Sequence, residues 1–216
     1  MGDIKIGQGI VDLQNKIGLK DDFFKNLLNE DDWSFVIKLH ALIEAIMTSL
    51  LVFHFNEKKL TQIFSRLEMS NKATGKLAFL KETGLLGDDN LKYIYNLSEL
   101  RNKFVHNVEN CNIELIKFVE SLDKNQLKNF ATFMRPSESV VRNIVKMGHD
   151  ENLDKDLIRQ SEIKSLIDFA IKEPKTHIWL GAYSLLVSIS DTFYYSDYLQ
   201  SIKAKELFDD DRKIFE

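Results

Sequence analysis

The sequence contains few of the residues that break helices. Nine glycines and two prolines occur in 216 residues, about 5% of the chain against a usual share of about 12%. A β-rich fold with many tight turns needs more of both residues, so this composition favours long helices. The single cysteine, Cys111, excludes an intramolecular disulfide and a metal site built from several cysteines.

Neither sign of charge is in large excess, because the formal net charge is −4. Such a chain has no general attraction to nucleic acid, although a local basic patch is compatible with it. No basic head followed by an apolar block opens the sequence, so no secretory signal is expected. In the first apolar helix the longest run without Lys, Arg, Asp or Glu is Ala45–Asn56, which is too short to span a bilayer. We expect a cytoplasmic protein with no membrane partner.

Apolar periodicity predicts helices along nearly the whole chain, so the expected fold class is all-α. The expected helices cover residues 8–17, 21–29, 33–56, 57–66, 72–83, 90–108, 113–121, 124–133, 138–147, 161–172, 174–198 and 199–208. Helix 33–56 is the expected central helix, because its apolar residues recur every three or four positions and share one face. These residues are Val36, Leu39, Ile43, Ile46, Leu50 and Phe53.

A change in pattern near residues 123–137 suggests a division of the chain. Residues 1–123 would form a helical bundle, and residues 124–216 would form a C-terminal helical extension. The alternative is a loop inside one continuous domain.

Several common catalytic motifs are absent from the sequence. It contains no Gly-rich phosphate loop, dinucleotide-binding fingerprint, nucleophile elbow or metalloprotease helix motif. His40 and Glu44 stand one helical turn apart, as metal ligands or as a hydrogen-bonded pair. Since no third ligand is evident, we expect no metal and no cofactor.

An arginine interrupts the apolar stripe of helix 90–108. The stripe consists of Ile94, Leu97, position 101, Phe104 and Val108, and position 101 is Arg101. An unpaired buried charge is very costly, so Arg101 must meet a carboxylate or face a cleft. Glu44 is the only carboxylate between residues 34 and 56 of the central helix. The pattern therefore predicts an ion pair between Glu44 and Arg101.

The same helix carries a polar motif around Arg101. Asn102 and His106 are four residues apart and share a face, whereas Arg101 and His106 lie about 140° apart around the helix. One interpretation is structural, with a buried salt bridge and a hydrogen-bonded histidine at a helix end. The other follows from the motif Arg101-Asn102-x3-His106, which resembles the signature of the HEPN superfamily.

Other segments extend this resemblance. In chain order they are Phe64-Ser65-x-Leu67, Lys76-Leu77-Ala78-Phe79, Gly84-Leu85-Leu86 and Arg101-Asn102-Lys103-Phe104-Val105-His106. Together they resemble the mannitol-operon-repressor-like branch of the superfamily over residues 33–120. The resemblance implies a helical bundle that forms a homodimer, in which two signature helices face each other.

In catalytic HEPN proteins this dimer builds a metal-independent endoribonuclease site. The resemblance implies that His106 accepts the proton of the RNA 2′-OH and that Arg101 binds the phosphate. Asn102 would orient the imidazole or hold a phosphate oxygen. His40 and Glu44 are expected to support the site.

Basic residues near the motif are candidate RNA contacts. Residues 57–81 carry a local charge of +4. We expect Lys72, Lys76 and Lys103 to bind the RNA backbone; the alternative is an ordinary solvated helix face.

Three functions compete. The first is an RNA-cleaving toxin or phage-defence protein with an antitoxin partner. The second is a non-catalytic transcriptional regulator or interaction module, like the repressor that names the branch. The third is a subunit of a larger defence or nucleotidyltransferase system, in which the acidic tail contacts a partner.

Overall fold

The computed structural model describes residues 6–106, 114–135 and 155–214. All regular structure in these residues is helical, which confirms the expected all-α class. The elements are α1 (Gln8–Lys16), α2 (Phe23–Asn26), η1 (Leu27–Asn29), α3 (Asp32–Phe55), η2 (Lys58–Leu60), α4 (Thr61–Arg66), α5 (Lys76–Glu82), α6 (Asp88–Val105), α7 (Leu115–Glu120), α8 (Lys124–Phe133), α10 (Lys155–Lys172) and α11 (Pro174–Ile214). Cys111, Val108 and the expected helix 138–147 lie outside the described residues.

The central helix predicted from periodicity is α3. Asp31 caps its first turn, because Oδ1 accepts a hydrogen bond from the Ser34 backbone N–H at 2.9 Å. The predicted stripe is buried from Val36 to Leu50, while Phe53 near the end of the helix is half-buried. Helix α3 ends at Phe55, and the next residue, Asn56, caps it in the left-handed conformation with a φ of 49°.

By length and composition alone, α3 could also cross a membrane. The expectation against this rested on the short uncharged run, but a longer window of the helix holds few enough charges to qualify. Half of that window is buried inside the fold, and core helices of soluble proteins meet the same criterion.

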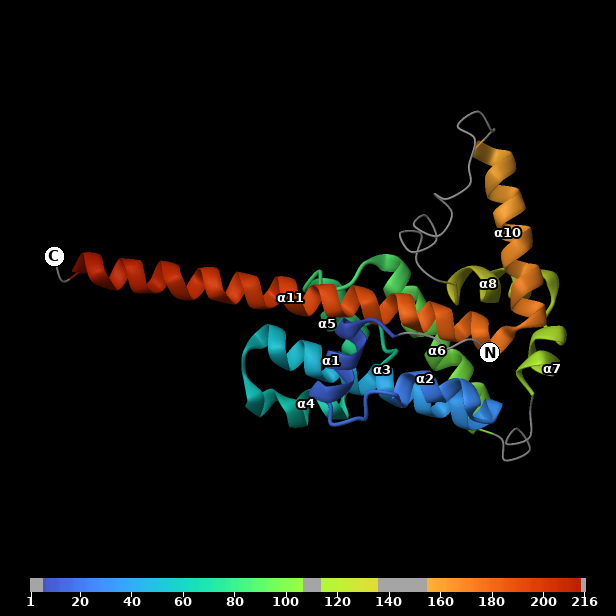
Figure 1. Cartoon of the computed structure of the whole chain (residues 1–216), viewed down its shortest axis with the longest axis horizontal. Helices are drawn as coiled ribbons and strands as arrows, with labels where there is room; N and C mark the ends of the chain where they lie inside the picture. Colours follow the sequence, from blue (N-terminus) through green and yellow to red (C-terminus); the bar gives the residue numbers. More distant parts are fainter. Residues whose placement is uncertain (1–5, 107–113, 136–154, 215–216) are drawn as a thin grey trace.

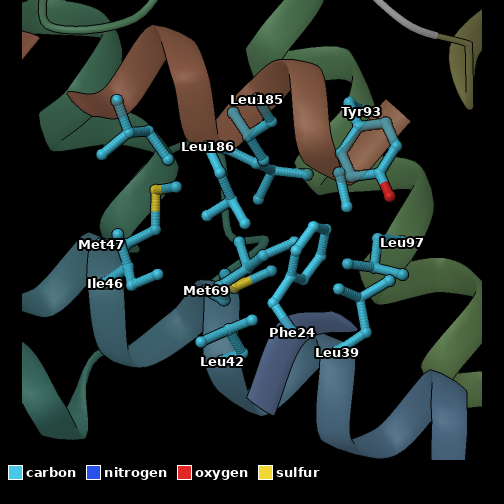
Figure 2. Close-up of a cluster of buried hydrophobic side chains, with 14 of the residues drawn as sticks. Phe24, Leu39, Leu42, Ile46, Met47, Met69, Tyr93, Leu97, Leu185 and Leu186 are labelled. Atoms are coloured by element: carbon cyan, nitrogen blue, oxygen red, sulfur yellow. The ribbon is translucent and has the colours of Figure 1, made fainter. Parts of the chain in front are cut away.

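Helices α6 and α11 pack against α3 and complete the core. Figure 2 shows side chains of α3 meeting Leu185 and Leu186 of α11, with Tyr93 and Leu97 of α6 beside them. The Tyr93 hydroxyl donates to the Ile178 carbonyl of α11 at 2.8 Å, which ties these two helices together. The core cluster extends from Ile10 to Phe193, so residues on both sides of the predicted boundary contribute to it.

Helix α11 is one continuous helix of 41 residues, and the expected break between residues 198 and 199 is wrong. No glycine or proline occurs between Ala182 and Ile214, so no residue in this stretch interrupts backbone hydrogen bonding. Figure 1 shows the C-terminal part of α11 extending beyond the other helices. Pro174 occupies its first position, where the missing N–H costs nothing.

Helix α5 begins at Lys76 and not at residue 72 as expected. The Asn71 side chain accepts hydrogen bonds from the backbone N–H groups of Ala73 and Thr74 at 2.9 and 3.0 Å, which forms a turn that competes with a helix. Gly75 follows this turn, and a Cβ there would collide with the Glu68 carbonyl oxygen. The turn therefore sets the position of Lys76, the first residue of α5.

Candidate functional site

The motif residues lie at the C-terminal end of α6. The helix ends at His106, whose backbone N–H bonds to the Asn102 carbonyl at 3.1 Å. Arg101 and Asn102 are half-buried, and His106 is exposed. All three side chains thus sit at or near the surface at one end of the helix.

One face of α3 lies along this part of α6. Trp33, His40 and Glu44 share that face, because they are spaced by seven and four residues. The indole Nε1 of Trp33 donates to the Phe104 carbonyl at 3.2 Å, and Nε2 of His40 lies 3.3 Å from the Ser98 hydroxyl. The two helices are therefore antiparallel, and this seam runs past Arg101.

The predicted ion pair between Glu44 and Arg101 is wrong. Glu44 Oε1 instead binds the ammonium of Lys76 at 2.7 Å, and no ion pair joins it to Arg101 among the described residues. The Lys76 side chain is 0% exposed and also donates to the Leu67 carbonyl at 2.7 Å. The position of α5 decides this pairing, because it brings a buried ammonium to Glu44.

Arg101 is left with an uncharged partner. Its Nη1 donates to Oδ1 of Asn102 at 3.1 Å, and that is the hydrogen bond the structure gives its guanidinium within the described residues. Because Lys76 already neutralises Glu44, the positive charge of Arg101 is uncompensated there. A half-buried guanidinium in this state favours an anion such as a phosphate.

His40 is a neutral member of this cluster. Burial lowers the pKa of His40; the Glu44 carboxylate opposes this shift, and the charges of Arg101 and Lys76 add to it. Its Nδ1 lies 3.9 Å from Glu44 Oε2, too long for a hydrogen bond. The expected hydrogen-bonded pair is therefore not formed, and His40 contacts Ser98 of α6 instead.

The three candidate RNA-binding lysines differ. Lys76 is wrong as an RNA contact, because its ammonium is buried against Glu44. Lys72 is exposed, with its ammonium 3.8 Å from the centroid of the Tyr95 ring. Lys103 is exposed on the last turn of α6. Tyr95 shares the face of α6 that carries Asn102 and His106, so Lys72 lies along the same face.

Arg101 and His106 stay apart within one chain. Among the described residues no side-chain hydrogen bond joins His106 to Arg101 or Asn102. Arg101 and His106 lie on diverging faces, whereas Asn102 shares the face of His106 but its side chain accepts from Arg101. Sequence reasoning missed Ser98 and Trp33 as neighbours of the motif. The signal was present, since Trp33 shares the helical face of His40 and Glu44.

No family model, no curated protein and no solved structure matches this chain in the comparisons with known proteins. Among the described residues, no group of three or more His, Cys, Asp and Glu side chains could hold a metal ion. The chemistry of the site is therefore argued from its own side chains.

Proposed function

We propose that the protein is a metal-independent endoribonuclease of the HEPN type that acts in the cytoplasm in toxin or phage-defence systems. One observation carries the proposal: Arg101 has no carboxylate partner among the described residues, because Lys76 neutralises Glu44. A buried salt bridge would have made Arg101 structural. A guanidinium whose hydrogen-bond partner is an amide can bind a phosphate through two parallel N–H···O hydrogen bonds.

The proposed reaction needs only the motif residues and RNA. His106 accepts the proton of a ribose 2′-OH as the 2′-oxygen bonds to the adjacent phosphorus. The bond from phosphorus to the 5′-oxygen breaks, and that oxygen takes up a proton. The products are a 2′,3′-cyclic phosphate and a 5′-OH end. Arg101 stabilises the charge that develops on the phosphate oxygens, and Asn102 holds the guanidinium in place.

A second copy of the chain completes this site. Arg101 and His106 diverge on one helix, so a phosphate that contacts both groups needs residues from two chains. Beside the site, one face of α3 is partly exposed in the single chain. That face carries Ile37, Ala41, Ala45 and Thr48, of which the alanines are exposed and the other two are half-buried. We expect this face to pack against the same face of a second copy.

Cleavage of single-stranded RNA in the presence of a chelator tests the proposal. His106→Ala should abolish cleavage, and Arg101→Lys should reduce it, since lysine keeps the charge but loses the fork of donors. His54→Ala is the matched control, because His54 is half-buried at the far end of α3 and should leave activity unchanged. A wild-type protein that cleaves no RNA, with His106→Ala lowering the melting temperature, would make the motif structural.

A non-catalytic interaction module is the second candidate, supported by a different surface. Tyr194, Tyr195 and Tyr198 are each 62% exposed on α11, and the Tyr194 hydroxyl donates to Asp12 Oδ2 of α1 at 3.3 Å. Tyrosine is enriched at protein interfaces, so this surface suits an antitoxin or regulatory protein. Substituting these tyrosines should then disrupt a complex, and neither the wild-type protein nor the variant should cleave RNA.

A further inference from the structure

A tryptophan lies against the end of the helix that carries the motif. Trp33 is the second residue of α3, and its Nε1 donates to the Phe104 carbonyl at 3.2 Å. Phe104 belongs to the last turn of α6, two residues before His106 and one turn after Arg101. The indole is therefore held at the site by a contact that also provides a partner for a helix-end carbonyl.

The two tryptophans of the chain differ in their surroundings. Trp179 is 3% exposed, and its ring stacks on Phe24 with a centroid distance of 4.6 Å. Trp33 is half-buried, and no aromatic ring pairs with it among the described residues. Trp179 lies within the core, whereas Trp33 packs partly against the core and stays partly exposed at the end of α6 that carries the motif.

We infer that Trp33 is a stacking platform for an unpaired nucleobase next to the phosphate that is cleaved. This inference rests on the proposed ribonuclease function and specifies its substrate as single-stranded RNA. An indole fixed by a hydrogen bond presents a large π face at little cost in side-chain entropy. Proteins that recognise single-stranded RNA stack splayed bases on such rings.

The chemistry also requires an unpaired base at this place. Attack by the 2′-oxygen needs that oxygen, the phosphorus and the leaving 5′-oxygen in line, which a stacked A-form helix does not provide. A base held on Trp33 would leave the helical stack and let its ribose turn. Because every base has a π face, this platform predicts weak base preference and strong preference for unpaired RNA.

Tryptophan fluorescence tests this contact directly. In Trp179→Phe/His106→Ala, Trp33 is the only tryptophan and cleavage is blocked, so a 12-nucleotide single-stranded RNA should quench its emission in a saturable way. The matched protein Trp33→Phe/His106→Ala retains only Trp179, whose emission should not change. If Trp179→Phe is unstable, the RNA-induced quenching is measured in His106→Ala and in Trp33→Phe/His106→Ala. The difference between the two values reports the same contact.

Affinity provides the second measurement. Trp33→Leu should weaken RNA binding about 5- to 150-fold, the range for the loss of one stacked base. Trp33→Phe should lose less, because it keeps a ring. RNA that binds tightly without quenching Trp33 would overturn the stacking platform and leave the ribonuclease proposal standing. A protein that binds no RNA would overturn both.

Discussion

Removing the Glu44 carboxylate should destabilise the protein more than removing its partner Lys76. The reason is an asymmetry in burial, because the Lys76 side chain is 0% exposed and that of Glu44 is 35% exposed. Glu44→Ala leaves a buried ammonium with the Leu67 carbonyl as its acceptor. Lys76→Met leaves a carboxylate that water can reach, and methionine fills most of the space of the lysine stem.

The magnitudes follow from this difference. Removing one partner of a buried ion pair costs about 3–5 kcal/mol of the free energy of unfolding. We expect a cost of about 3 kcal/mol for Glu44→Ala, because water can partly reach the Lys76 ammonium through the vacated position. Lys76→Met should cost about 1–2 kcal/mol, the lower part of the range of about 1–3 kcal/mol for an unsatisfied polar group, because water reaches Glu44. The double variant Glu44→Leu/Lys76→Met should recover most of the loss, because it removes both charges together.

Urea unfolding followed by circular dichroism at 222 nm measures these free energies. In thermal melts, Glu44→Ala should lower the melting temperature by about 6–12 °C, at about 2–4 °C for each kcal/mol. A double-mutant cycle that combines Glu44→Ala with Arg101→Gln serves as the control. Its coupling free energy should be clearly smaller than that of the cycle that combines Glu44→Ala with Lys76→Met. If Lys76→Met is as destabilising as Glu44→Ala, or Arg101 shows the stronger coupling, the reasoning fails.

Three further predictions concern acid stability, close packing and assembly. Burial lowers the pKa of His177 to about 4 from 6.5, so the unfolded state binds more protons between these values and stability falls as pH falls through that window. The loss should approach about 3 kcal/mol in urea unfolding, and His177→Phe should remove that part of the pH dependence; a pH-independent difference between the two proteins would contradict it. Gly181→Ala should lower the melting temperature although alanine favours helices, because its Cβ would collide with the Met134 carbonyl oxygen and the Tyr93 ring; unchanged stability would show that α11 can shift. Light scattering should give a dimer, and Ala41→Arg should give a folded monomer that does not cleave RNA; an active monomer would rule out the shared site.

Much of the fold is predictable because its signals are local. The scarcity of glycine and proline favours long helices, and the spacing of apolar residues from Val36 to Leu50 identifies the buried face of α3. Asp31 caps this helix through a contact three residues away. Each of these features depends on residues within one or two helical turns, so the sequence carries them without knowledge of the neighbouring helices.

The ends of helices were harder to predict where side chains compete with the backbone. The turn at Asn71 delays the start of α5, and this depends on an amide side chain accepting two backbone hydrogen bonds. The end of the long helix was wrong for the opposite reason. The prediction placed a boundary between residues 198 and 199, but the helix continues because no glycine or proline there interrupts its hydrogen bonds.

The sequence alone determined that Arg101 needed a carboxylate partner or an open position, because a buried guanidinium cannot remain without either. Only the tertiary structure decided between these outcomes. Glu44 is 57 residues from Arg101 and 32 from Lys76, and both distances along the chain are too long for sequence spacing to discriminate. The placement of α5 brings Lys76 to the carboxylate, and among the described residues Arg101 is left with the Asn102 amide as its hydrogen-bond partner.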